Sequence, residues 1–274
     1  MKKILVPTDF SKEAENAIKV AAQLAEKHSC EIILLHMLDL PLTQLIAGSS
    51  PADLPEAVYF MRLAHKQFED IMSKPYLKNV TVTEMVDFHD INTGILEVSK
   101  EHNIDLIVMG SHGATGLKEM FIGSNAEKLV RTSDIPVLVI KNEHNNFNIE
   151  DFVFASDFEN DNRETFKQAT KLADTFNAKI HLLMVNTVSN FTTTASAKVK
   201  IQDFITGTTF TNYTTNIYND QTVEKGILNF SHIINADLIG ISTHGRQGIA
   251  HFLNGSLSED LVNHANRPVI TFKI

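Results

Sequence analysis

Glycine, serine and histidine recur with the same spacing at two places in the chain. In the first half, Gly110-Ser111-His112-Gly113 is separated by nine residues from Gly123-Ser124-Asn125. In the second half, Ser242-Thr243-His244-Gly245 is separated by nine residues from Gly255-Ser256, so that only the first glycine is replaced. Glycine allows sharp turns whose N–H groups converge, and the N-terminus of a helix carries a partial positive charge. The pattern therefore predicts loops that bind phosphate groups.

The segments around these loops predict the elements that position them. Short aliphatic runs alternate with longer segments of helical period, which is typical of a parallel sheet with crossover helices. Strands of the first half are expected at residues 4–8, 31–38, 80–86, 105–110 and 135–140. Helices are expected at residues 12–27, with Ser11 as N-cap, at 93–102 and from 123 onward. A further helix is expected to follow a proline-containing loop after the second strand and to end at about residue 73. Each predicted loop thus lies between a buried strand and the start of a helix.

The length of 274 residues is sufficient for two domains. A polar segment at residues 142–148 has no regular period and predicts a connection between them. We expect one domain at residues 1–142 and a second at residues 149–274.

The second domain is expected to be a copy of the first. Residues 179–185 match residues 31–37 with an offset of 148 (179 − 31). Residues 237–242 match residues 105–110 with an offset of only 132 (237 − 105). The second copy therefore lacks about 16 residues (148 − 132), most simply in the loop and helix that follow its second strand.

Composition excludes several classes of function. A net charge of −9 repels phosphate backbones, so we expect no nucleic acid partner. No apolar run reaches the roughly 18 residues of a membrane span, and the single Cys30 favours a reducing compartment, so the expected location is cytoplasmic. The 12 histidines come without a HExxH or CxxC pattern, so no metal site is expected. His112 and His244 lie in the two loops, where an imidazole either contacts a phosphate or has a purely structural role.

The glycine pattern, the strand end Pro7-Thr8-Asp9 and the five-strand arrangement resemble the universal stress protein family, twice over nearly the whole chain. The resemblance implies an α/β fold of two doubly wound, Rossmann-like parallel sheets, each with strand order 3-2-1-4-5. It also implies that the halves pack as an internal pseudo-dimer through their last strands, and a further homodimer stays open. The implied ligand is ATP, with any Mg²⁺ held by its phosphates, and at most slow hydrolysis.

The resemblance also assigns roles to individual residues of the first half. Thr8 and Asp9 would contact adenine and ribose, and Met37 and Met109 would form apolar walls of the base pocket. The remaining positions would surround the ribose and phosphates; they are Gly110, His112, Gly113, Gly123, Ser124 and Asn125.

The second half has a candidate at each matching position. These are Ser156, Asp157, Val185, Ile241, His244, Gly245, Gly255 and Ser256. Two departures are important: Ala155-Ser156-Asp157 lacks the proline of the first turn, and Ser242 stands where a glycine with positive φ is expected. We therefore expect weaker nucleotide binding, or none, in this half.

The favoured function is a stress-response regulatory protein that binds ATP. A P-loop ATPase is disfavoured because G-x4-G-K-S/T is absent from the sequence. An adenylating or sulfur-transferring enzyme would carry a Ser-Gly-Gly-x-Asp-Ser loop where Thr8-Asp9-Phe10-Ser11 stands. The alternative that stays open is an interaction or small-ligand module in which one or both pockets have been redirected. A purely structural interpretation also stays open, in which the glycines only form turns and Asp9 only interacts favourably with the dipole of a helix.

Overall fold

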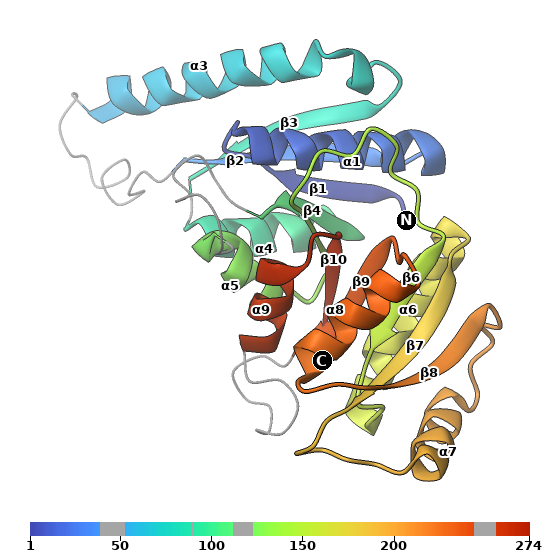
Figure 1. Ribbon diagram of the computed structural model, residues 1–274. Helices are drawn as coiled ribbons and strands as arrows, with labels where there is room; N and C mark the ends of the chain where they lie inside the picture. Colours follow the sequence, from blue (N-terminus) through green and yellow to red (C-terminus); the bar gives the residue numbers. More distant parts are fainter. Residues whose placement is uncertain (39–52, 89, 112–122, 244–255) are drawn as a thin grey trace. The chain divides into compact units, whose positions relative to one another are not determined.

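The structure, a computed structural model, describes residues 1–38, 53–88, 90–111, 123–243 and 256–274. The described chain forms two compact units. Unit 1 holds residues of the ranges 1–111, 123–129 and 140–147, and unit 2 holds 130–139 and 148–274. Figure 1 shows the elements of both units in sequence colours.

Unit 1 is an α/β unit with parallel strands in the order β3-β2-β1-β4. Its strands are β1 (Lys3–Pro7), β2 (Glu31–Met37), β3 (Thr81–Asp87) and β4 (Leu106–Gly110). Its helices are α1 (Lys12–His28), α3 (Asp53–Met72), the 3₁₀ helix η1 (Pro75–Leu77), α4 (Ile91–Glu101) and the first part of α5 (Ser124–Thr132). Helices α1 and α3 lie on one face of the sheet and α4 on the other (Figure 1).

Helix α1 shows how the sequence determines these elements. Ser11 caps its N-terminus, since the Ser11 side chain accepts a hydrogen bond from Ala14 N, as predicted. Its apolar face is buried, and Ser29 ends it in the left-handed conformation. The helix therefore covers one face of the sheet and directs its N-terminal turn toward the carboxyl ends of β1 and β4.

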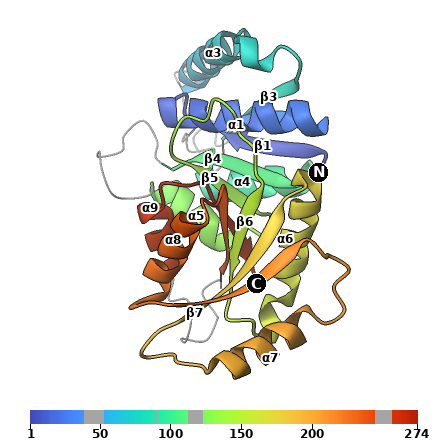
Figure 2. The same cartoon turned by 45° about the vertical axis from the view of Figure 1, so that its right-hand side comes forward.

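Unit 2 repeats this arrangement with strand order β8-β7-β6-β9-β10, which is the predicted order 3-2-1-4-5. Its strands are β6 (Asp151–Ala155), β7 (Lys179–Asn186), β8 (Tyr213–Asn219), β9 (Leu238–Thr243) and β10 (Val269–Lys273). Its helices are η2 (Asn160–Asn162), α6 (Arg163–Phe176), α7 (Thr194–Ile205), α8 (Val223–Ile233) and α9 (Ser256–His264). Helices α6 and α7 lie on one face of this sheet and α8 and α9 on the other, so the unit is doubly wound (Figure 2).

The last strands of the two repeats pair with each other. Strand β5 (Val137–Ile140) runs antiparallel to β10, with Leu138 opposite Ile270. Both strands are almost wholly buried, so pairing removes the exposed apolar edges that each repeat would otherwise present. The paired residues Val137–Val139 accordingly belong to unit 2.

The shortening of the second copy falls between β7 and β8. Strand β7 keeps the offset of 148 from β2 (179 − 31), whereas β8 already has the offset of 132 from β3 (213 − 81). The helix between them is correspondingly shorter, with 12 residues in α7 against 20 in α3. The difference in length between the two copies therefore lies between these strands, and the loop at residues 39–52 of the first copy is outside the described residues.

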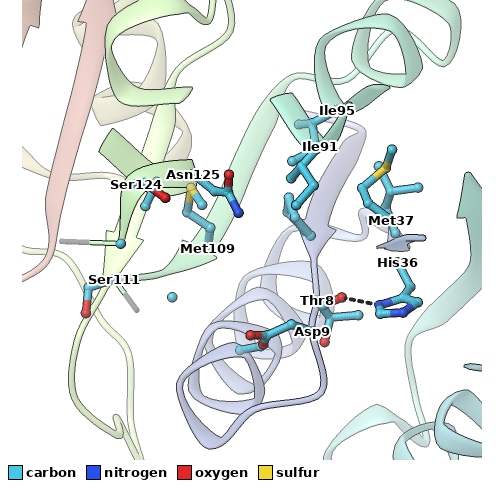
Figure 3. A pocket seen from close by; sticks show the side chains of 16 residues that line it. Thr8, Asp9, His36, Met37, Ile91, Ile95, Met109, Ser111, Ser124 and Asn125 are labelled. Atoms are coloured by element: carbon cyan, nitrogen blue, oxygen red, sulfur yellow. Dashed lines mark hydrogen bonds between the residues drawn. The ribbon is translucent and has the colours of Figure 1, made fainter. Parts of the chain in front are cut away.

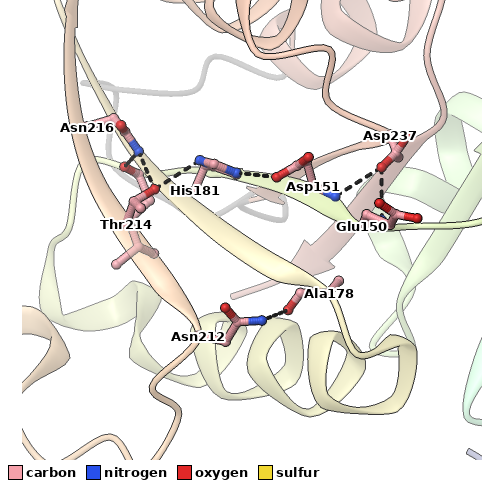
Figure 4. A network of polar contacts seen from close by, with 9 residues as sticks. Glu150, Asp151, Ala178, His181, Asn212, Thr214, Asn216 and Asp237 are labelled. Atoms are coloured by element: carbon pink, nitrogen blue, oxygen red, sulfur yellow. Dashed lines mark hydrogen bonds and ion pairs between the residues drawn. The ribbon is translucent and has the colours of Figure 1, made fainter.

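A polar network in unit 2 ties β6, β7 and β8 together (Figure 4). His181 on β7 is 8% exposed; its Nε2 lies 2.7 Å from Asp151 Oδ1 and its Nδ1 lies 2.9 Å from Thr214 Oγ1. Asn216 Nδ2 donates to the same hydroxyl at 3.1 Å. In neutral His181, Nε2–H donates to the carboxylate and Nδ1 accepts the threonine proton. The network thus satisfies both ring nitrogens of a buried histidine.

We expect His181→Leu to lower the free energy of unfolding by about 1–2 kcal/mol, because two hydrogen bonds of a buried ring are lost. Urea denaturation followed by circular dichroism measures the change. His232→Leu is the matched control, since His232 is exposed on α8. Equal stability of the two variants would show that the network contributes nothing.

Candidate functional site

A cavity of about 230 Å³ lies in unit 1 beyond the carboxyl ends of β1, β2 and β4 (Figure 3). This is the edge of an open parallel sheet at which ligands bind. Eight of the residues selected from the sequence line it: Thr8, Asp9, Met37, Met109, Gly110, Gly123, Ser124 and Asn125. The structure therefore brings together residues from the turn after β1, from the ends of β2 and β4, and from the start of α5, which are far apart in the sequence.

The turn after β1 forms the floor of this cavity. Thr8 Oγ1 accepts a hydrogen bond from Phe10 N at 3.0 Å, and Asp9 Oδ1 accepts one from Ser11 N at 3.1 Å. Phe10 has a φ of 63°, a left-handed conformation that costs energy for an aromatic residue. Such strain concentrates at functional sites, where the surrounding structure holds it in place. The turn is therefore built to hold Thr8 and Asp9 in fixed positions.

His36, which the sequence did not single out, supports this turn from β2. Its Nδ1 lies 2.8 Å from the Thr8 carbonyl oxygen, so Nδ1 carries the proton and donates. Its ring lies 4.5 Å from the ring of Phe10, which in turn meets Phe68 of α3 edge-on at 5.1 Å. A histidine at the carboxyl end of an otherwise apolar strand was the available signal. His36 is thus a positioning residue of the site.

The apolar side of the cavity is formed by Met37, Met109, Ile91 and Ile95. Met109 is 7% exposed and Ile95 1%, so both are held rigidly. Figure 3 shows Met37 and the two isoleucines on one side and Met109 on another. Ile91 and Ile95 are four residues apart on α4, a spacing that looks like ordinary core, which is why sequence reasoning missed them. These side chains offer a slot for a flat apolar ring.

The polar side is the beginning of α5. Gly123 N donates to the Ser111 carbonyl at 2.7 Å, and α5 starts at the next residue. The first N–H groups of any α-helix have no partner within the helix, and they carry the positive end of its dipole. Asn125 is oriented by Asn92, whose Nδ2 donates to Asn125 Oδ1 at 3.3 Å. The site thus joins an apolar slot to an anion-binding helix end.

Gly110 is required for a reason other than the one expected. Its φ is not in the left-handed region, because Gly207 is the positive-φ glycine among the described residues. Instead, a Cβ at Gly110 would lie 2.8 Å from the carbonyl carbon and oxygen of Glu13. The expectation of a positive φ was therefore wrong, and glycine is needed for the close approach of α1 to β4.

Unit 2 accommodates Ser242 at the matching position. Helix α6 begins at Arg163, which corresponds to residue 15 (163 − 148) rather than residue 12 of the first copy. Residues 160–162, which match residues 12–14 of α1, form the 3₁₀ helix η2, and the Ser242 Oγ lies 2.7 Å from Thr165 Oγ1. Ser242 is therefore accommodated within β9, and the loop that it was expected to disturb lies outside the described residues.

The turn after β6 duplicates the turn of unit 1. Phe158 has a φ of 58°, its N–H donates to Ser156 Oγ at 2.9 Å, and Glu159 N donates to Asp157 Oδ1 at 3.1 Å. Asp157 and Val185 line a cavity of unit 2, whereas Ser156 lies in the turn. Ser256 is the first residue of α9. The predictions for His112, Gly113, His244, Gly245 and Gly255 lie outside the described residues.

Comparisons with known proteins agree with this geometry. The profile of the universal stress protein family matches residues 1–141 and 216–273. Universal stress protein MJ0577 of Methanocaldococcus jannaschii is 30% identical over 158 residues, which is 52% of this chain and 96% of that protein. Universal stress protein YxiE of Bacillus subtilis is 29% identical over 147 residues, which is 51% of this chain and 98% of that protein.

A solved structure extends the likeness to both units. A universal stress protein from Archaeoglobus fulgidus is 21% identical, with a TM-score of 0.69 over 99% of this chain and 98% of that one. At this identity the likeness concerns the fold alone. In the described part of the chain, no helix is long and apolar enough to cross a lipid bilayer.

Proposed function

This chain belongs to the universal stress protein family, and from that membership and the cavity of unit 1 we propose that it is a cytoplasmic stress-response regulatory protein that binds ATP. One observation carries the proposal: the cavity joins a rigid apolar slot to the N-terminus of α5. An adenine ring needs an apolar slot, and a triphosphate needs the N–H groups at a helix N-terminus.

Each part of the nucleotide has matching residues. The base fits between Met37, Ile95 and Met109, and Asp9 is an acceptor for ribose hydroxyl groups at the end of β1. The N–H groups at the start of α5 and the Ser124 hydroxyl suit the phosphates. No lysine or arginine is among the described residues that line the cavity. Bound Mg²⁺ would be held by the phosphates.

The proposed role is regulation by occupancy rather than turnover. The Thr8 hydroxyl and the Asp9 carboxylate both hold the turn through main-chain hydrogen bonds. Their fixed geometry suits binding, since a ligand finds them already in position. A cytoplasmic location agrees with Cys30, which is buried and forms no disulfide.

The direct test is to denature the freshly purified protein and identify any released nucleotide by chromatography. Nucleotide-free protein is then titrated with ATP by calorimetry, with GTP as the control. We expect about one ATP per chain, because the described lining of the unit 2 cavity includes no helix N-terminus that could bind the phosphates. Absence of both co-purified nucleotide and calorimetric binding would refute the proposal, and two equal sites would refute its restriction to unit 1.

A further inference from the structure

The cavity of unit 2 differs in position and chemistry from the cavity of unit 1. Its volume is about 370 Å³, and it lies between the carboxyl ends of β6 and β7 and helix α7. No residue of β9 or α9 is among the described residues that line it, whereas β4 and α5 contribute to the cavity of unit 1. Its lining is mostly polar: Asp157, Glu159, Met184, Val185, Asn186, Ser189, Asn190, Thr192 and Lys200.

Asp157 is a carboxylate with unused hydrogen-bonding capacity. Its Oδ1 accepts from Glu159 N at 3.1 Å and from Asn162 Nδ2 at 2.7 Å. Among the described residues, no donor reaches Oδ2. Lys200 forms its ion pair with Glu159 rather than with Asp157. Burial raises the pKa of Asp157, which means that its charged form lacks solvation.

Three apolar side chains are exposed on the segments that carry the lining of this cavity. Val188 is 96% exposed, Phe191 72% and Val199 61%, and each is adjacent in sequence to a residue that lines the cavity. The turn that carries the first two is fixed by Asn186, whose Nδ2 donates to Thr192 O at 2.9 Å and whose Oδ1 accepts from Thr192 N at 3.3 Å. Exposed apolar side chains on a fixed support are typical of binding surfaces.

The charges of the lining select the ligand. Two carboxylates, Asp157 and Glu159, face one cation, Lys200, so the cavity has a net charge of −1 (−2 + 1). We infer that this cavity binds a small organic ammonium with an alkyl chain, such as an alkyl diamine. Its ammonium group donates to Asp157 Oδ2 and offsets the negative charge of the cavity, while its alkyl chain contacts Met184 and Val185, the apolar residues of the lining.

Putrescine is the probe, because its four-carbon chain carries an ammonium group at each end. Calorimetric titration of the full chain compares it with butane-1,4-diol, which has the same chain length without charge, and with succinate, an anion. We expect saturable binding of putrescine alone. Equal binding of the diol would replace the proposal with a neutral polyol site, and binding of succinate would overturn it.

Two variants test the assignment of residues. Asp157→Asn should weaken the binding of putrescine at least about tenfold. Asp203 is an exposed acid on α7, and Asp203→Asn should leave the binding of putrescine unchanged. Lys200→Met removes a charge of the same sign as the ligand and should strengthen the binding of putrescine by about threefold. Weaker putrescine binding in Lys200→Met would contradict a cationic ligand, because only an anion gains from that lysine. Unchanged binding in Asp157→Asn would place the amine elsewhere.

The asparagine variant is not expected to unfold. Asparagine keeps the Oδ1 acceptor for both hydrogen bonds and resembles the protonated carboxyl. Since the folded-state pKa of Asp157 is raised, protonation of this group stabilises the native state, and its contribution to stability increases as pH falls through that pKa. We therefore expect the melting temperature of Asp157→Asn at pH 7 to be equal to or above that of the parent. A loss of putrescine binding then reports on the site rather than on the fold.

Discussion

Replacing Gly123 by aspartate is expected to lower the affinity for ATP by at least about tenfold, a loss of about 1.4 kcal/mol or more of binding free energy. Gly123 lies immediately before α5 and lines the cavity of unit 1. Aspartate is a favourable residue before a helix, where its carboxylate accepts from the first N–H groups. The variant should therefore fold normally while its negative charge occupies the place of the phosphates.

Gly123→Asn is the matched control for this variant. Asparagine has the same size and the same capping ability, but it lacks the charge. We expect Gly123→Asn to lose much less affinity than Gly123→Asp, with native circular dichroism in both. If both variants bound ATP as the parent does, the start of α5 would not contact the phosphates, and the proposed orientation of the nucleotide would be wrong.

The fold was predictable because duplication gives each element two independent signals. The offset of 148 fixes β1 with β6 and β2 with β7, and the offset of 132 fixes β3 with β8 and β4 with β9. Buried strands and amphipathic helices are determined by local patterns of apolar residues, so one sequence sufficed. The pairing of β5 with β10 was accessible only through the family resemblance, because an apolar strand does not reveal its partner.

The candidate site was predictable only in part. Glycines and strand ends revealed the residues whose main chain matters, such as Gly123. The left-handed Phe10 and Phe158 were missed, because a positive φ at phenylalanine opposes local preference and is imposed by tertiary contacts. His36 and Asn92 were missed for a related reason, since their roles depend on groups 28 residues away (36 − 8) and 33 residues away (125 − 92).

The second large effect is expected at Gly110, where alanine should lower the free energy of unfolding by about 1–3 kcal/mol. A Cβ there would lie 2.8 Å from main-chain atoms of Glu13, and a main chain in the first turn of a capped helix cannot move aside cheaply. Displacement of that turn would also shift Asp9, so ATP affinity should fall together with stability. Urea denaturation and ATP titration measure the two effects.

Ser242 provides the matched experiment in the other unit. Because α6 begins later than α1, a side chain is tolerated there, and Ser242→Ala should lose only the hydrogen bond to Thr165, about 0.5–1.5 kcal/mol. ATP affinity should stay unchanged in this variant, since Ser242 does not belong to unit 1. The two repeats thus differ at this contact: the first has Gly110 at the strand position, whereas the second has Ser242 there and an α-helix that begins later. Equal effects of Gly110→Ala and Ser242→Ala on both stability and ATP binding would show that the start of the helix does not determine which residue is allowed.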